Sequence, residues 1–257
     1  MDNFGSWLGS CRIIFMRQDL YCQMYNQEEY YWWHKAKRNL VHRYIKGKNL
    51  KILDIGCGTG KLLEELQPYG KVYGLDANPQ ALKFCRKRHL RYLFQGHFPQ
   101  IPNINHQFDV IICLDVLEHI GDDQTSFQVI RKLLKPSGFA IITVPAYPWL
   151  FSYWDKILGH QRRYGKKDLK RLAKLAKLKV IKLSYLYSFL VPLGIPFRLI
   201  RQITSKNQTP SSDFINLPSK AHQWLLALAK VEHHLLKYIN LPFGLSLFCI
   251  LKKYDST

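Results

Sequence analysis

Acidic residues and paired cysteines are scarce in this sequence. Asp and Glu total 18 against 38 Lys and Arg, which leaves the 257-residue chain with a formal net charge of +20. None of its six cysteines forms a C-x-x-C pair and no Cys/His cluster has zinc spacing, which excludes a zinc module and a thioredoxin-type redox site. Several cysteines lie inside apolar runs, where a free thiol behaves as a small hydrophobe. We therefore expect a reducing, cytoplasmic location.

Long apolar runs are missing as well. No uninterrupted stretch reaches the roughly 18 to 20 residues of a membrane-spanning helix, and residues 1–16 lack the basic start and apolar core of a signal peptide. At 47% hydrophobic and 14% aromatic, the chain still has enough apolar side chains for one sizeable core. Its positive charge favours a polyanionic partner, either nucleic acid or an anionic membrane face, although a soluble protein can also simply be basic.

Apolar segments and helical patterns alternate from residue 51 onward. Buried strands are predicted at 51–55, 71–75, 91–94, 108–114 and 139–144, with helices at 60–66, 79–88 and 125–134. A helix over 18–46 precedes them, and helices at 167–178 and 219–239 and strands at 180–187 and 245–251 follow. Strands and helices that alternate at this spacing indicate an α/β fold, with a parallel sheet covered on both faces.

The first predicted strand runs directly into a glycine-rich turn at Gly56, Gly58 and Gly60. In an open α/β sheet, ligands bind beyond the carboxyl ends of the strands, and glycines let the backbone approach them closely. Asp54 stands two residues before the first glycine, where a carboxylate suits a ligand with an ammonium group better than a phosphate. Asp76 closes the next strand, where a carboxylate can accept hydrogen bonds from both ribose hydroxyls.

These residues carry a family resemblance. Residues 52–60 resemble the first motif of class I S-adenosylmethionine-dependent methyltransferases, and residues 72–76 resemble their second. The resemblance runs from about residue 49 to residue 146. A nicotinamide-binding fold would also place an acid at Asp76, but its G-x-G-x-x-G turn needs a glycine where Lys61 stands. The resemblance implies a Rossmann-like, seven-stranded, mostly parallel sheet with helices on both faces and an antiparallel last strand.

The same resemblance implies S-adenosyl-L-methionine as the cofactor. An acidic residue after the third strand usually contacts the adenine in this family, but this sequence has His97 in that region, which makes His97 a candidate only. Contacts to the cofactor are expected from Asp54, Gly56, Cys57, Gly58, Gly60, Asp76, Ala77, His97 and Leu114. We divide the chain into a helical cover at 1–48, a cofactor-binding core at 49–187, an apolar helical insertion at 188–244, and a final strand and tail at 245–257.

The segment after the fourth strand contains Asp115, Glu118 and His119. In the family it faces the reacting end of the cofactor. His119 is a candidate general base, because an imidazole titrates near neutral pH. Alternatively, the three side chains hold a divalent ion, as a similar pattern does in some ubiquinone-type O-methyltransferases, or they only shape the turn. We assign no metal ligand.

An aromatic and charged loop over residues 147–164 follows the fifth strand and leaves the same sheet edge as the glycine turn. It resembles the G-H-x-R-R-Y loop of a bacterial subgroup of type 11 methyltransferases. His160 or Tyr164 is expected to take a proton from the acceptor, and Arg162 and Arg163 to bind a carboxylate or phosphate. Alternatively, Asp155 pairs with one arginine and only fastens a lid. The predicted catalytic residues are His119, His160, Arg163 and Tyr164.

Two later segments suggest contact with lipid. The predicted helix at 167–178 has lysines on one side and apolar residues on the other, as do helices that rest on anionic lipid, although packing against the sheet explains it equally well. Residues 185–200 are apolar but contain two prolines, which argue against a spanning helix. This segment is expected to dip into a membrane or line the site of a lipid-like acceptor, unless it packs in the core beside the helix at 219–239.

These features predict a methyltransferase that acts on a small or lipid-like acceptor, with O-methylation favoured, in the cytoplasm and peripheral on the inner face of the membrane. The alternatives are an RNA, DNA or protein methyltransferase that uses its basic surface, and a cofactor-binding protein without activity. Nucleic acid is the less favoured partner. No RNA-binding module is evident, and residues 115–118 replace the Asn/Asp-Pro-Pro-Tyr tetrad that base-amino methyltransferases tend to carry.

Overall fold

A computed structural model describes residues 18–101, 104–204 and 217–253 of the chain. The segment that was tested for a signal peptide, residues 1–16, lies outside the described residues. None of the described helices is long and apolar enough to cross a membrane.

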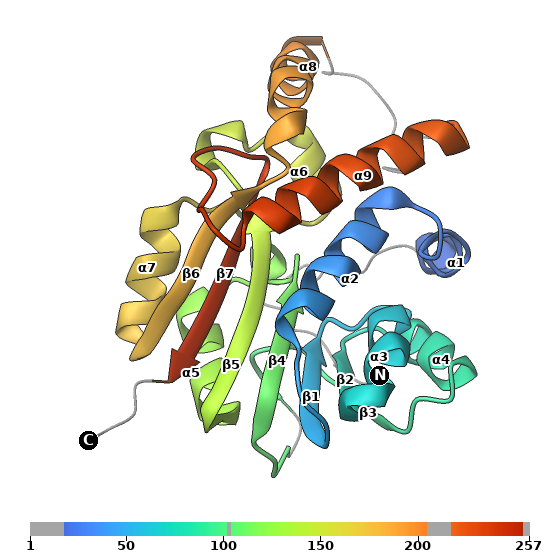
Figure 1. The fold of residues 1–257 in the computed structure, drawn as a ribbon, viewed down its shortest axis with the longest axis vertical. Coiled ribbons are helices and arrows are strands. Elements are labelled where there is room, and N and C mark those ends of the chain that lie inside the picture. The colour runs from blue at the N-terminus through green and yellow to red at the C-terminus, as the bar shows by residue number, and fades with distance from the viewer. Residues whose placement is uncertain (1–17, 102–103, 205–216, 254–257) are drawn as a thin grey trace, which may run out of the picture.

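Seven strands form one sheet in the order β3-β2-β1-β4-β5-β7-β6 (Figure 1). Strands β1 to β5 pair in parallel, and β7 is antiparallel to both β5 and β6. This confirms the predicted sheet, including the antiparallel last strand. The strands are β1 (Leu50–Ile55), β2 (Gly70–Asp76), β3 (Tyr92–Gln95), β4 (Phe108–Leu114), β5 (Leu134–Pro145), β6 (Leu178–Leu186) and β7 (Ser246–Lys253).

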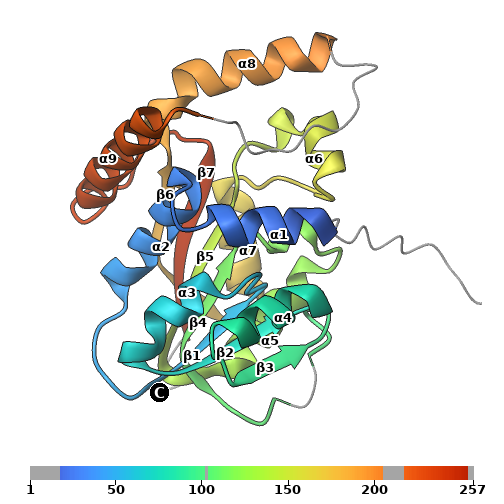
Figure 2. The same ribbon diagram turned by 90° about the vertical axis from the view of Figure 1, so that its right-hand side faces the viewer.

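Helices cover both faces of the sheet, as Figure 2 shows from the side. Alternation along each strand sends successive side chains to opposite faces, so Leu53 and Ile52 belong to two different apolar cores. The first core packs α5 (Asp123–Leu133) and α7 (Lys166–Leu175) against the sheet. The second packs α2 (Trp32–Tyr44), α3 (Lys61–Leu66), α4 (Pro79–Lys87) and α9 (Ser219–Leu235) on the other face.

The predicted helix over 18–46 is wrong, because the structure breaks it into α1 (Gln18–Gln27) and α2. The break has a polar cause. Arg38 of α2 donates a hydrogen bond to the main-chain carbonyl of Glu28, at 2.6 Å, and the Glu28 side chain turns away to residues near the glycine turn. Apolar spacing alone did not reveal these contacts, because the partners of Glu28 lie 31 and 60 positions away.

The loop at 147–164 and the apolar insertion also contain helices. The loop holds η3 (Pro148–Leu150) and α6 (Tyr153–Ile157), and the insertion holds η4 (Ser188–Leu190) and α8 (Val191–Thr204), which has Pro196 inside it. Two further 3₁₀ turns are η1 (Gln67–Tyr69) and η2 (Leu117–His119). The apolar side of α7 is buried on the sheet at Leu169, Leu172 and Ala173, so the expectation that this side rests on lipid is wrong.

Candidate active site

The glycine turn joins the carboxyl end of β1 to α3. Gly56, Gly58 and Gly60 have φ angles of 71°, 54° and 83°, a left-handed conformation that side chains with a Cβ adopt at a cost. The main-chain N–H groups of Gly56 and Cys57 donate to the carbonyl of Leu75 at the end of β2, at 2.8 and 3.1 Å. The first two strands and the turn are therefore fastened together at one point.

Two buried carboxylates face this turn, Asp54 from β1 and Asp76 from β2. Asp76 accepts hydrogen bonds from the main-chain N–H groups of Gly58 and Asn78, at 2.9 and 2.8 Å. Burial raises the pKa of both carboxyls, and the charge of Asp76 raises that of Asp54 further. No described basic side chain forms an ion pair with Asp54. Two neighbouring buried acids, of which Asp54 has no ion pair with a described basic side chain, fit a positively charged ligand.

The other predicted cofactor contacts lie around the same turn. Cys57 is buried, with its Sγ 3.9 Å from that of Cys85, and a hydrogen bond to Cys85 together with burial raises the pKa of its thiol. The N–H of Ala77 is a further hydrogen-bond donor that lowers the pKa of Asp76, and the charge of His97 acts in the same direction. Leu114 ends β4, two strands from Asp76. The structure thus brings all nine predicted residues to the carboxyl ends of β1 to β4.

Helix α1 lies over the glycine turn, a contact that the sequence did not predict. A Cβ added to Gly58 would come within 2.7 Å of the Met24 side chain, and the Tyr21 hydroxyl forms a hydrogen bond with Asn78 next to Asp76. Burial and the charge of Asp76 raise the pKa of Tyr21. The helix therefore forms a wall of the cofactor site.

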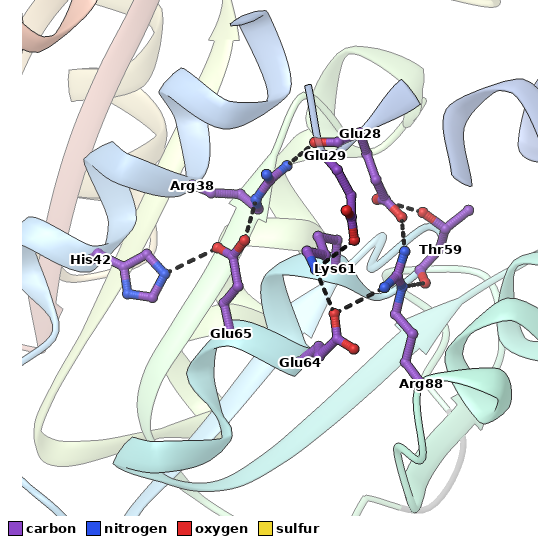
Figure 3. A network of polar contacts seen from close by, with 9 residues as sticks. All are labelled: Glu28, Glu29, Arg38, His42, Thr59, Lys61, Glu64, Glu65 and Arg88. Carbon is purple, nitrogen blue, oxygen red and sulfur yellow. Dashed lines mark hydrogen bonds and ion pairs between the residues drawn. The ribbon is translucent and has the colours of Figure 1, made fainter. Parts of the chain in front are cut away.

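A network of buried charges holds α1 in this position (Figure 3). Glu28 follows α1; its Oε1 lies 2.6 Å from Nη2 of Arg88, and its Oε2 accepts a hydrogen bond from the Thr59 hydroxyl at the same distance. Arg88 also donates to the main-chain carbonyl of Thr59, at 3.1 Å, and pairs with Glu64 at 2.9 Å. The pair of Glu28 and Arg88 thus connects α1 to the glycine turn itself.

On the acceptor side, Asp155 of α6 is fully buried and binds three basic groups. Its carboxylate lies 3.0 Å from His160 Nδ1, 2.7 Å from Arg163 Nη2 and 3.5 Å from Arg198 Nη1. Burial alone would raise the pKa of Asp155, but the hydrogen bonds from His160 and Arg163 and the two guanidinium charges outweigh it and hold the pKa well below its usual range. An ionised Asp155 therefore fixes the His160 ring and leaves Nε2 free to act.

The segment after β4 joins the two halves of the site. Val116 lies against Gly56, where an added Cβ would overlap its side chain, and Glu118 Oε1 lies 4.0 Å from His160 Nε2. Glu118 is buried, with no hydrogen-bond partner at Oε2 among the described residues. Burial raises its pKa to about 8, and burial lowers that of the nearby Lys37 to about 7. The segment after β4 thus touches both the glycine turn and the His160 ring.

The structure changes the set of side chains that could hold a metal ion. Glu118, His119 and His160 place one potential ligand atom each within 4.8 Å of one another, so a divalent cation could be held there. Asp115 does not belong to this group, because its carboxylate forms an ion pair with Lys37 and accepts a hydrogen bond from the Thr143 hydroxyl, at 2.9 Å. His160 replaces it, from a loop position 45 residues after Asp115.

Two residues that were predicted to be catalytic, Tyr164 and Arg163, have a structural role instead. Tyr164 is buried and its hydroxyl donates to the main-chain carbonyl of Leu117, at 3.1 Å; burial and then the charge of Asp123 raise its pKa, so it is not placed to take a proton. Arg163 is buried between Asp155 and the carbonyl of Ala146 and cannot bind an acceptor. The Asp155–Arg163 pair is the contact that the lid-fastening alternative expects, but Asp155 also binds His160 and Arg198.

His119 is less suited to be a base than His160. Burial and the charge of His160 lower its pKa to about 4, and its Nδ1 lies 3.2 Å from the carbonyl of Gly159. Arg162 faces Asp123, at 2.8 Å, and is half-buried. Of the residues predicted to be catalytic, His160 therefore fits proton transfer best, because Asp155 holds its Nδ1 and leaves Nε2 to take a proton.

Relatives of the chain match about half of its length. Residues 53–140 match a family described as a methyltransferase domain. A ubiquinone biosynthesis O-methyltransferase of Klebsiella pneumoniae is 32% identical over 143 residues, which cover 50% of this chain and 57% of that protein. A demethylmenaquinone methyltransferase of Geobacillus stearothermophilus is 30% identical over 129 residues, which cover 46% of this chain and 55% of that protein. The chain thus spans little more than half of these relatives.

Solved structures extend the similarity to the whole fold. A methyltransferase in complex with the Haloferax volcanii Trm112 activator matches with a TM-score of 0.62 and 16% identity, over 93% of this chain and 96% of that one. Phosphoethanolamine N-methyltransferase 2 of Haemonchus contortus, bound to S-adenosyl-L-methionine, matches with a TM-score of 0.57 and 16% identity, over 87% and 53%. Residues 53–140 therefore match a methyltransferase domain family, and the described residues have the fold of these solved methyltransferase structures.

Proposed function

We propose that this protein is an S-adenosylmethionine-dependent methyltransferase that transfers the methyl group to a hydroxyl of a small, lipid-like acceptor of the quinone type. The observation that carries the proposal is the Asp155–His160 pair beside the segment that touches Gly56. A buried carboxylate that orients an imidazole is a base suited to a weakly acidic hydroxyl. One relative is named as an O-methyltransferase of ubiquinone biosynthesis and the other as a demethylmenaquinone methyltransferase. Both names favour a quinone-type acceptor, and the first favours a hydroxyl as the target.

The donor side would be held by residues already described. Asp54 would face the positive end of the cofactor, and Asp76 the ribose hydroxyls, while the glycine turn lets the backbone approach closely. When bound, S-adenosyl-L-methionine supplies an activated methyl group on a positive sulfur. The protein's own contribution is to orient the acceptor, to exclude water and to hold a proton.

His160 takes the proton from the acceptor hydroxyl. Asp155 accepts the hydrogen bond from Nδ1–H of His160, which would leave the lone pair on Nε2 available to take the hydroxyl proton of the acceptor. The carboxylate then stabilises the positive imidazolium. Arg163 and Arg198 keep Asp155 ionised throughout, because their charges lower its pKa.

Aromatic side chains near this pair suit an apolar ring. Tyr147 stacks on Tyr185 with ring centroids 5.3 Å apart, and Trp149 lies next to it at 5.6 Å. Trp149 and Tyr153 are each at least half exposed, at 60% and 50%. Such side chains offer contact area to a hydrophobic acceptor. A cytoplasmic location is part of the proposal and is supported by the free thiols of Cys57 and Cys85.

The test compares two histidines on a short-chain prenylated catechol with methyl-labelled cofactor. His160→Gln is expected to lower kcat by about 100-fold or more, because a general base contributes at least that much. His119→Gln, the matched control on the neighbouring ring, is expected to lose far less. Cofactor affinity, measured by titration calorimetry, should stay the same in both. Equal turnover by wild type and His160→Gln would refute the assignment of the base.

A further inference from the structure

Helix α9 has apolar side chains on the side that faces solvent. Five of them are spaced by four, three, four and three residues, which places them along one face of the helix and of the turn that follows it. They are Trp224, Leu228, Val231, Leu235 and Tyr238. Their exposed fractions are 72%, 45%, 60%, 43% and 67%. A row of large apolar side chains this exposed marks a contact surface, because soluble proteins rarely leave such a patch open.

The opposite side of α9 already anchors the helix to the protein. Ala229 and Leu236 are buried in the core that includes α2. The Glu232 carboxylate accepts hydrogen bonds from the main-chain N–H groups of Tyr187 and Ser188 at the start of η4. The helix thus needs only one face for folding, and the exposed row takes no part in the core.

The exposed face of α9 is cationic as well as apolar. Lys220, Lys230 and Lys237 are exposed beside the apolar row, and Glu232, the only acid in α9, lies on the buried side. A second copy of this chain would bring lysines against lysines, in a protein whose net charge is +20. Nucleic acid would match the charge but not the apolar row. A surface that is both apolar and anionic fits both features.

Helix α8 adds to the same surface. Leu193 and Phe197 are 77% and 52% exposed, and Phe243, between α9 and β7, is 48% exposed. Figures 1 and 2 place α8 and α9 together at one end of the molecule, beyond the end of the sheet at which β1, β4 and β5 finish. The glycine turn lies at that same end of the strands. Helices α8 and α9 therefore lie at the end of the molecule at which the glycine turn lies.

We infer that the exposed face of α9, with α8, docks on the surface of a bilayer that contains acidic phospholipids. The apolar row enters the boundary between headgroups and acyl chains, with Trp224 and Tyr238 at its two ends, and the lysines lie among the phosphates. The helix lies on the bilayer and does not cross it. The inference goes beyond the proposed function, because binding requires neither cofactor nor acceptor; it also explains how a lipid-like acceptor is reached.

Vesicle flotation tests this with the full chain and no cofactor. Wild type is expected to float with vesicles of equal phosphatidylglycerol and phosphatidylcholine, and to bind at least tenfold more weakly to phosphatidylcholine alone or in 0.5 M NaCl. The double variant Trp224→Ser/Leu228→Ser should lose at least tenfold in binding to the acidic vesicles. The matched control Leu175→Ser/Ile181→Ser removes two side chains of similar exposure, 49% and 50%, on α7 and β6 and should bind like wild type.

Three results would overturn the inference. They are the absence of wild-type binding to acidic vesicles, wild-type binding by the Trp224→Ser/Leu228→Ser variant, and a dimer in sedimentation that this variant dissolves, which would assign the face to a second copy. Turnover of the double variant on a water-soluble catechol separates the two proposals. It should equal that of wild type even when vesicle binding is lost.

Discussion

Asp155 binds three basic groups while fully buried, and the geometry of the proposed base depends on it. The carboxylate is also the N3 residue of a capping box, in which it accepts the main-chain N–H of Ser152 at 2.9 Å. One side chain thus fixes the start of α6 and the orientation of His160, and it also balances the buried charge of Arg163. Its loss affects both stability and catalysis, and the pH dependence of stability separates these two effects.

Asp155→Asn is expected to lower the free energy of unfolding by about 3 kcal/mol at pH 7, because it leaves the buried Arg163 without its counter-ion. The folded-state pKa of Asp155 is lowered, so its stabilisation is present above the unfolded value near about 3.9 and is lost as the pH falls toward the folded value. Urea unfolding should therefore show the difference from wild type shrinking below about pH 4. The control is Asp122→Asn. Asp122 is an exposed N-cap residue of α5, and asparagine can cap the helix in its place. A difference that grows on acidification would contradict this account.

Sequence reasoning located residues whose role depends on local context. Asp54, Asp76 and the glycines lie at strand ends in a turn of fixed spacing, so their position follows from the order of the residues. His160 was found through the G-H-x-R-R-Y loop to which it belongs, and the structure places its partner Asp155 five positions before it. Lys37 and Arg88 were missed, because their partners lie 78 and 60 positions away and nothing in the local pattern marks a buried charge.

At the scale of elements, the pair of Glu28 and Arg88 determines where α1 lies. Both side chains are buried, and Arg88 also holds the Thr59 carbonyl of the glycine turn. Burial raises the pKa of Glu28 even with this cation present, so the carboxylate depends on its partner. We expect that a variant in which α1 is less well ordered also binds the cofactor more weakly.

Arg88→Met is expected to lower the free energy of unfolding by about 3 to 5 kcal/mol, because the Glu28 carboxylate stays buried without a partner. Hydrogen exchange should rise in residues 18–31 before the core strands respond, and the Kd for S-adenosyl-L-methionine should increase at least tenfold. Arg86→Met, two positions before Arg88 and exposed on α4, serves as the control and should behave like wild type. Unchanged exchange in α1 of Arg88→Met would show that the pair does not hold the helix.

Most strands and helices were predicted to within a few residues, because buried parallel strands read as apolar runs between turns. The predictions failed where side-chain contacts override periodicity. The break between α1 and α2 is made by Arg38 and Glu28, and α6 depends on the capping box at Ser152. The exposed apolar row of α9 could not be predicted either, since a helix with apolar residues on both faces gives no sign of which face is buried.

At the scale of the whole molecule, the net charge of +20 produces repulsion that the fold must overcome. Added salt screens this repulsion, because at 0.1 M exposed charges more than one Debye length apart, roughly 10 Å, interact only weakly. We expect Tm to rise by about 2 to 4 °C between 20 and 300 mM NaCl, equivalent to roughly 1 kcal/mol for a chain of this size. Differential scanning fluorimetry measures it, and a fall in Tm would mean that surface ion pairs outweigh the net charge.

Methyl transfer to a lipid-like hydroxyl is the central claim, and one measurement tests it most directly. The wild-type protein is incubated with S-adenosyl-L-methionine that carries a deuterated methyl group and with a whole-cell extract separated into lipid, nucleic acid and protein fractions. We predict that mass spectrometry finds the label as a new methoxy group on an aromatic compound in the lipid fraction, and that His160→Gln abolishes it. Label in nucleic acid or protein alone, or bound cofactor with no label transferred to any fraction, would contradict the claim.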